Sequence, residues 1–124
     1  MMRNNTKTEG PSPEERLWEL QADICQTLAN PKRLQILALL KDQKELSVGE
    51  MVRALKIPKP NLSQHLALMR QKGILRARRQ GTVIYYRLAT PAITAACEVM
   101  RQVLLQALQE KGELSARLEI AVEG

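Results

Sequence analysis

The chain has 124 residues, 44% of them apolar, and a net charge of +6. This length fits one domain that can bury about two-thirds of its unfolded surface. No apolar run approaches the roughly 18 residues that cross a membrane, and the polar start MMRNNTKTEGPSPEER lacks the apolar core of a secretion signal. We therefore expect a cytoplasmic protein with one domain over residues 13–111, a flexible tail over 1–12 and a second tail over 112–124.

Two helices are expected first. Apolar side chains recur over residues 13–29 at the spacing of one helical face. That stripe consists of Leu17, Leu20, Ile24 and Leu28. Asn30 followed by Pro31 is the pattern of an N-cap and a first helical residue, so a second helix should begin there. This second helix is apolar on nearly every side, as expected of a central core helix. The side chains expected to face inward are Leu34, Leu37 and either Ile36 or Leu40.

The next two helices form a closely spaced pair. Ser47 and Glu50 match a capping box, which predicts a third helix running to about Lys56. A turn follows, since the residue before each proline of the Ile57-Pro58-Lys59-Pro60 segment is pushed out of the α region. A fourth helix should start near Pro60 and end at Gly73, a residue typical of the C′ position. Two helices joined by a tight turn beside basic residues form a helix-turn-helix pattern.

Alternating residues over 74–79 and 83–88, around Gln80-Gly81-Thr82, predict a β-hairpin. Thr90 and Pro91 repeat the N-cap pattern, and a last helix should run to about Lys111. The expected fold is therefore mainly α with a small β-hairpin. Its order is four helices, the hairpin and a final helix. A hairpin placed directly after a helix-turn-helix is the winged helix-turn-helix arrangement.

Basic residues are concentrated around this pattern. Nine Lys or Arg residues and no Asp or Glu lie between Met51 and Cys97, whereas the remaining ten basic and thirteen acidic residues give −3. A basic block on a mildly acidic body indicates a polyanion as partner. The alternative is an ordinary solvated basic surface.

The fourth helix has two different faces. Leu62, Leu66 and Met69 share one face, whereas the opposite face carries short polar side chains around the small residue Ala67. Ser and Gln side chains can hydrogen-bond to base edges, and a small residue lets a helix lie deep in the major groove. Basic residues near the helix end and on the hairpin can reach phosphates, which provide affinity and register. The alternative is an amphipathic helix and hairpin without this role.

The residues expected to contact DNA are Lys59, Pro60, Asn61, Ser63, Gln64, His65, Arg70, Lys72, Arg78, Arg79 and Thr82. His65 is the only histidine, and we expect it to pack or contact phosphate rather than bind a metal, because no other ligand type lies near it in sequence. Nothing supports an enzyme: there is no Ser-His-Asp set, carboxylate pair or Gly-rich phosphate loop. A winged helix that binds other proteins is a further alternative.

Residues 15–108 resemble the ArsR/SmtB family of winged-helix repressors. The segments that carry the resemblance are LANPKRLQIL (28–37), ELSVGEM (45–51), LSQHLALMRQKGIL (62–75) and RRQGTVIYYRL (78–88). The resemblance implies a homodimer, formed mainly by the first and last helices, that covers an inverted-repeat operator and leaves it when an effector binds. The residues implied at the dimer interface are Leu17, Leu20, Ile24, Ile93, Met100, Leu104 and Leu108.

The chain departs from the sensing sites of this family. The place of a metal-binding Cys-x-Cys in the third helix holds Ser47-Val48-Gly49, and the last helix has no Asp or His for a zinc site. Ala38 and Leu105 occupy the places of the cysteines in persulfide-sensing members. A conventional zinc site is therefore not expected.

Cys25 and Cys97 remain, and two interpretations of them stay open. They are small buried apolar residues, or they are thiols that bind a soft metal or metalloid, or that form a reversible disulfide or persulfide with an oxidant or sulfur species. We expect a homodimeric repressor released by such an effector. The alternative is an effector-independent or nucleoid-type DNA-binding protein with purely structural cysteines.

Overall fold

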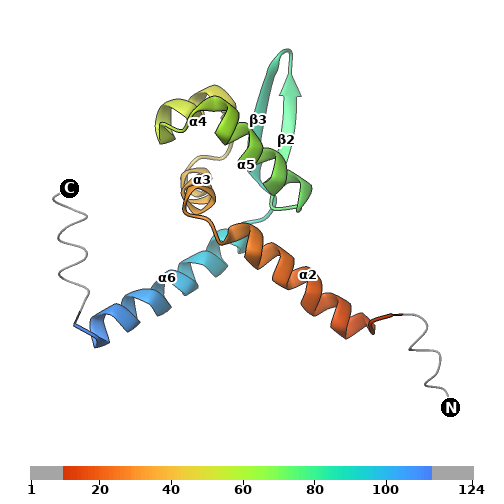
Figure 1. Ribbon diagram of the computed structural model, residues 1–124. Helices are drawn as coiled ribbons and strands as arrows, with labels where there is room; N and C mark the ends of the chain where they lie inside the picture. Colours follow the sequence, from red (N-terminus) through yellow and green to blue (C-terminus); the bar gives the residue numbers. More distant parts are fainter. Residues whose placement is uncertain (1–9, 113–124) are drawn as a thin grey trace. The chain divides into compact units, whose positions relative to one another are not determined.

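The computed structural model describes residues 10–112, so most of both expected tails lies outside the described residues. The elements are α2 (Pro13–Leu28), α3 (Pro31–Asp42), β1 (Leu46–Ser47), α4 (Val48–Leu55), α5 (Lys59–Gln71), β2 (Leu75–Gln80), β3 (Val83–Leu88) and α6 (Ala92–Glu110) (Figure 1). They form a mainly helical winged helix-turn-helix, as predicted. The chain divides after Ala89 into two units, which are described separately; the boundaries of a single domain at 13–111 remain a prediction.

Local capping sets the helix starts. The Asn30 side chain accepts hydrogen bonds from the Lys32 and Arg33 N–H groups, at 2.9 and 3.2 Å. Ser47 and Glu50 form the expected capping box, with bonds of 2.8 and 3.1 Å in the two directions. These contacts satisfy N–H groups that have no partner inside the helix, which is why polar residues precede α3 and α4.

The core of the first unit, residues 10–89, lies between α3, α4, α5 and the sheet. Its buried apolar residues are Ile36, Leu37, Leu40, Met51, Ile57, Leu62, Leu66, Met69, Ile74, Leu75 and Tyr86. The prediction that Leu34 faces inward is wrong, because this side chain is 43% exposed. Ile36 and Leu40 are both buried, where only one was expected. A helix that is apolar on most sides has no periodic signal for its buried face, so spacing could not identify it.

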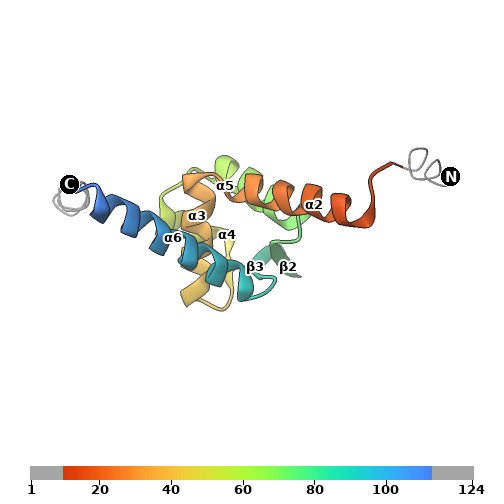
Figure 2. The same cartoon turned by 90° about the horizontal axis from the view of Figure 1, so that it is seen from below.

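The sheet has three antiparallel strands in the order β1-β3-β2. Gln80 pairs with Val83, so the hairpin turn contains two residues rather than the three that were expected. Of the two turn residues, Gly81 alone has a positive φ, of 65°, as the first central residue of a type II′ turn requires. The sequence analysis missed β1, because a strand of two residues is too short for an alternating pattern. Two views show the hairpin beside α5 (Figures 1 and 2).

In Figure 1 the N-terminal part of α2 extends away from the other helices of its unit, whereas in Figure 2 α2 overlaps α5. Thr27 is its one buried residue among those described. Most of the apolar stripe predicted on α2 is exposed: the exposed fraction is 57% for Leu17, 45% for Leu20 and 40% for Ile24, and the neighbouring Trp18 is 61% exposed. Leu28, the last residue of the stripe, is half-buried. Among residues 10–112, no helix is long and apolar enough to cross a membrane.

Candidate nucleic-acid interface

A tight turn joins α4 to α5. Lys56 closes α4 in a left-handed conformation, with φ 56° and ψ 38°, and its N–H donates to the Val52 carbonyl at 2.8 Å. Pro58 is extended at ψ 140°, and its carbonyl accepts from the Leu62 N–H at 2.9 Å. Pro60 fits the first turn of α5, where an N–H has no helical partner. The helix-turn-helix predicted from the prolines is therefore present.

The two faces of α5 differ as predicted. Leu62, Leu66 and Met69 have exposed fractions of 0% and fix the helix against the core. The exposed residues at the start and on the outer face are Lys59, Pro60, Asn61, Ser63, Gln64 and Ala67. Within residues 10–112, the side chains of Ser63 and Gln64 make no hydrogen bond to protein, so their polar groups are available to an external partner. That these residues contact DNA remains a prediction.

The end of α5 leads directly into the hairpin through a Schellman motif. The Gly73 N–H donates to the Arg70 carbonyl at 3.0 Å, and the Ile74 N–H donates to the Met69 carbonyl at 2.9 Å. Gly73 has φ 80°, which most side chains would disfavour. Met69 and Ile74, the two positions between which this motif often has an apolar contact, are both buried. This motif fixes the hairpin at the end of the exposed helix.

Two of the basic residues expected to reach phosphates have acidic partners within the chain. The Lys72 ammonium lies 2.8 Å from the Asp23 carboxylate on α2. Arg78 donates two hydrogen bonds to Glu45, at 2.7 and 3.0 Å, and its guanidinium lies 4.7 Å from the centroid of the Tyr85 ring. The hydrogen bond from Arg78 holds the pKa of Glu45 below its usual value, and the pKa of Arg78 is raised by the same bond. Both pairs compete with phosphate for these cations.

Sequence reasoning missed two further arginines on the hairpin. Arg76 and Arg87 are cross-strand partners, and both side chains are exposed. Like charges placed directly opposite each other destabilise a sheet, and an anion between them relieves that repulsion. A two-residue turn at Gly81 and Thr82 makes residues equally distant from the turn cross-strand partners, and counting outward from it would have paired Arg76 with Arg87. Arg79 pairs with Ile84 instead, so it lies on the other face of the hairpin.

His65 lies at the edge of the buried face and is half-buried. Its Nδ1 atom accepts a hydrogen bond of 3.2 Å from the Arg33 Nε–H group. Burial lowers the pKa of His65 first, and the positive charges of Arg33 and Lys32 lower it further. A packing role for His65 was one of the two expected; its partner Arg33, from a distant part of the sequence, was not foreseen.

The two thiols differ in exposure. In the single chain, Cys25 on α2 is exposed, whereas Cys97 on α6 is half-buried. Burial raises the pKa of the Cys97 thiol, which disfavours the reactive thiolate. No group of three or more His, Cys, Asp or Glu side chains capable of holding a metal occurs among residues 10–112. Sensing by these thiols remains a prediction.

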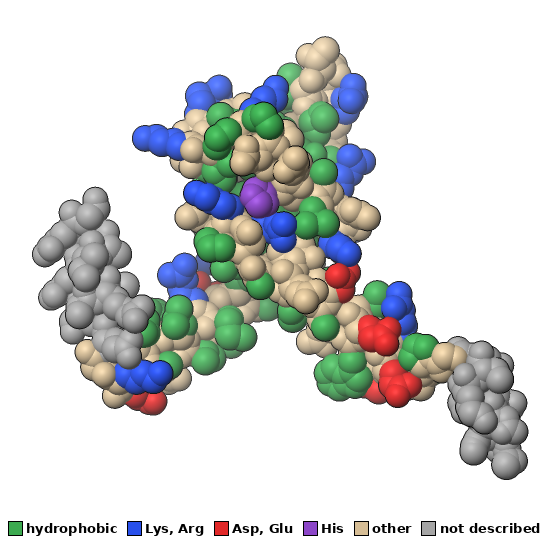
Figure 3. Space-filling view, in the orientation of Figure 1, with side chains coloured by type: hydrophobic (Ala, Val, Ile, Leu, Met, Phe, Trp, Pro, Cys, Tyr) green, Lys and Arg blue, Asp and Glu red, His purple; other side chains and the backbone are tan. Residues whose placement is uncertain are grey.

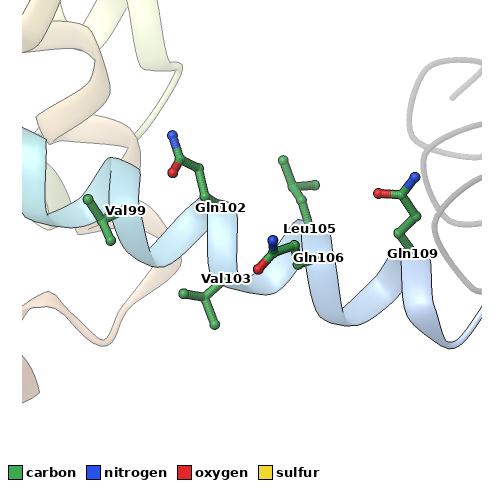
Figure 4. A pocket seen from close by; sticks show the side chains of 6 residues that line it. All are labelled: Val99, Gln102, Val103, Leu105, Gln106 and Gln109. Atoms are coloured by element: carbon green, nitrogen blue, oxygen red, sulfur yellow. The ribbon is translucent and has the colours of Figure 1, made fainter.

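A shallow hollow on α6 does not form an enclosed ligand site. Figure 4 shows its lining, and every residue comes from this one helix. The lining residues are Val99, Gln102, Val103, Leu105, Gln106 and Gln109. Ligand pockets normally bury most of their ligand between several elements, so we assign no ligand to this hollow.

Charge is unevenly distributed over the first unit. Lys and Arg side chains are spread over α4, α5 and the hairpin, whereas Asp and Glu side chains gather on α2 (Figure 3). The basic side is the one that carries the exposed face of α5. A surface of this kind, with a polar helix between cations, is complementary to the phosphates and base edges of a DNA groove.

Comparisons with known proteins agree with this geometry. Residues 30–77 match the family model described as "Bacterial regulatory protein, arsR family". An uncharacterized HTH-type transcriptional regulator of Mycobacterium tuberculosis, Rv0081, is 38% identical over 98 residues, which cover 78% of this chain and 85% of that protein. Its crystal structure matches with a TM-score of 0.70 and 36% identity, over 82% of this chain and 98% of that chain.

Two other similar proteins are described by their role. The transcriptional repressor PagR of Bacillus anthracis is 35% identical over 85 residues, covering 68% of this chain and 85% of that protein. Its crystal structure gives a TM-score of 0.62 over 68% of this chain and 97% of that chain, at 35% identity. A homodimeric winged helix-turn-helix DNA-binding domain from Mycobacterium bovis gives a TM-score of 0.67 at 32% identity, over 77% of this chain and 88% of that domain.

The relatives match across most of their own length, and the Mycobacterium bovis domain is described as a winged helix-turn-helix. These are transcriptional regulators and not enzymes. The chain therefore belongs to the arsR family of DNA-binding winged helix-turn-helix transcriptional regulators.

Proposed function

We propose that this protein is a homodimeric, sequence-specific repressor that reads DNA with α5. The observation that carries the proposal is the division of α5 into a fully buried apolar face and an exposed face of unpaired short polar side chains. Ser63 and Gln64 would meet base edges in the major groove. The basic hairpin beside them would contact phosphates. Among the described residues Arg76, Arg79 and Arg87 have no salt bridge, whereas Arg78 is paired with Glu45.

Exposed apolar side chains support the homodimer. Besides the stripe on α2, α6 leaves Met100 66%, Val99 59%, Leu104 54% and Val103 53% exposed. Soluble monomers rarely expose apolar patches on this scale, and a second copy would cover them. Ile93 and Leu108, also expected at the interface, are half-buried. The similar Mycobacterium bovis domain is described as homodimeric.

Release by a thiol-directed effector is the finer part of the proposal. A soft metal, a metalloid or a species that forms a disulfide or persulfide would act at Cys25 and Cys97. The support is their position, one on each of the two helices proposed to form the dimer interface. A regulator that binds DNA without any effector is the alternative.

The DNA-reading role can be tested with an operator selected in vitro from randomised duplexes. We expect an imperfect inverted repeat whose half-sites are about 34–36 Å apart, because the recognition helices of a two-fold dimer meet successive major grooves. Gln64→Ala should reduce the preference for operator over random DNA by about 1–3 kcal/mol if Gln64 makes a bidentate contact to a base. Fluorescence anisotropy would measure both affinities.

The matched control is Gln43→Ala, which removes the same exposed side chain at the end of α3 and should change neither affinity. Equal losses on operator and random DNA for Gln64→Ala would show that Gln64 does not read bases. Transcription from a promoter carrying the selected site gives the direction of regulation: a rise on adding the protein would contradict the repressor role.

A further inference from the structure

Arg33 connects three helices of the first unit. It belongs to the first turn of α3, and its Nε–H donates to His65 Nδ1 on α5 at 3.2 Å. Its Nη1 atom donates to the Thr27 carbonyl, in the last turn of α2, at 3.0 Å. The planar guanidinium presents its donors in a fixed fork, so one arginine can hold two acceptors in a defined relative position. The proposed DNA-reading helix is thereby linked to the exposed arm α2.

A second link joins the same two helices. Asp23, one turn before Thr27, bonds to Lys72 at the end of α5 at 2.8 Å, and the Thr27 hydroxyl donates to the Asp23 carbonyl at 2.9 Å. His65 and Lys72 are about 10 Å apart along α5 at 1.5 Å per residue. The buried face already fixes α5 against the core. One link would leave α2 free to rotate about it, whereas two links separated along α5 fix the direction of α2 relative to α5.

We propose that Arg33 is a positioning residue for DNA recognition: it holds α5 in a fixed orientation relative to α2, and it does so only while His65 is neutral. The proposal rests on the proposed function, because it concerns the helix that would read DNA. If α2 belongs to the dimer interface, this link also transmits the interface geometry to the recognition helices, whose separation the operator fixes.

The requirement for a neutral His65 follows from the direction of the bond. Arg33 is a donor only, so Nδ1 must offer a lone pair, and the ring proton must be on Nε2. Protonation would place an N–H on Nδ1 facing the Arg33 N–H, and the bond would be lost. The pKa of His65 in the folded protein is lowered, so the neutral form is favoured by folding. The link is therefore present above the unfolded value of about 6.5 and is lost as pH falls through the folded pKa.

The charged groups that affect the pKa of His65 are all positive. Arg33 and Lys32, both on α3, act on the ring and both favour its neutral form. Asp23 on α2 is bonded to Lys72, and neither it nor Glu50 on α4 perturbs the ring. The basic residues of β2 do not perturb it either. No described carboxylate therefore stabilises a protonated His65, which is the condition that the link requires.

The link itself can be tested without DNA, because the chain contains a single histidine and its ring signals are unambiguous in NMR spectra. We expect the Nε2–H tautomer and a pKa below 6.5 in the wild-type dimer. Arg33→Met keeps the aliphatic stem and removes the donors, so it should raise the pKa of His65 more than the control Lys32→Met does. An Nδ1–H tautomer, or equal effects of the two variants, would overturn the proposal.

The role in DNA recognition is tested by operator affinity. Arg33→Met and His65→Leu should each weaken operator binding about tenfold. The double variant should bind no more weakly than the weaker-binding of the two single variants, because both substitutions break the same link. Losses that add would mean two independent contacts and would refute the link's role. The slope of log K against log salt should stay unchanged in Arg33→Met. A slope smaller in magnitude by about one would indicate that Arg33 contacts a phosphate.

A conservative variant separates positioning from folding. Arg33→Lys keeps the charge and the stem but cannot hold two acceptors, so it should fold, dimerise and still lose most of the operator affinity that Arg33→Met loses. The affinity of the wild type should fall as pH drops through the pKa of His65, and Arg33→Lys should flatten this profile. Full affinity in Arg33→Lys would overturn the proposal. A wild-type chain that binds no DNA would instead refute the proposed function, while the NMR titration would still decide the link.

Discussion

Shortening one exposed side chain of α6 should weaken the proposed dimer by a calculable amount. Full burial of a Leu side chain contributes roughly 2 kcal/mol. Leu104 is 54% exposed in the single chain, so an interface can gain about half of that, or about 1 kcal/mol per copy. A two-fold interface contains both copies, which makes about 2 kcal/mol for Leu104→Ala. The dimer dissociation constant should therefore rise about thirtyfold.

Analytical ultracentrifugation over nanomolar to micromolar concentrations would measure this constant. Val83→Ala is a suitable control, because Val83 is similarly apolar and 39% exposed but belongs to the hairpin. It should leave the dissociation constant unchanged. The reasoning would be refuted if Leu104→Ala dimerised as tightly as the wild type, or if the wild type remained at its 14.0 kDa monomer mass at micromolar concentration.

Two further predictions concern the hairpin and the thiols. Glu45→Gln removes the anion that pairs with Arg78, so binding to any DNA should tighten at low salt, and the salt slope should steepen by about one if the freed Arg78 reaches a phosphate. The wild-type pair, whose Glu45 pKa is lowered, should be lost only as pH falls below the usual range of Glu, as a pH titration would detect. Cys25→Ser and Cys97→Ser should each leave operator affinity intact but abolish release by arsenite or an oxidant in anisotropy titrations; release that persists in both would exclude this site.

Local signals in the sequence predicted much of the fold because they act over a few residues. The Asn30 cap, the Ser47–Glu50 box and Gly73 each mark a helix end by a bond to a near neighbour. The apolar face of α5 was equally clear, since the polar residues opposite it make the period visible. Periodicity failed at Leu34, in a helix that is apolar on most sides.

The site was harder to predict, because its polar contacts join residues that are distant in sequence. Lys72 and Asp23 are 49 positions apart, and Arg78 and Glu45 are 33 apart. The bond between Arg33 and His65 spans 32 positions. The sequence alone does not show whether a basic side chain faces solvent or forms an ion pair with an acidic residue elsewhere in the chain. Composition therefore identified the basic surface, but it could not show which of its cations are already paired.

The two-faced character of α5 has a consequence for how such a regulator diverges. Residues on its outer face touch nothing that holds the fold together, so substitutions there should change stability by only about 0.5 kcal/mol. A change at Leu62 or Leu66, with no exposed surface, would cost several times more. After a gene duplication, one copy could therefore acquire a new DNA target through a few substitutions on this outer face that leave the stability and the fold unchanged. The same separation makes Ser63 and Gln64 the natural positions for engineering an altered target preference.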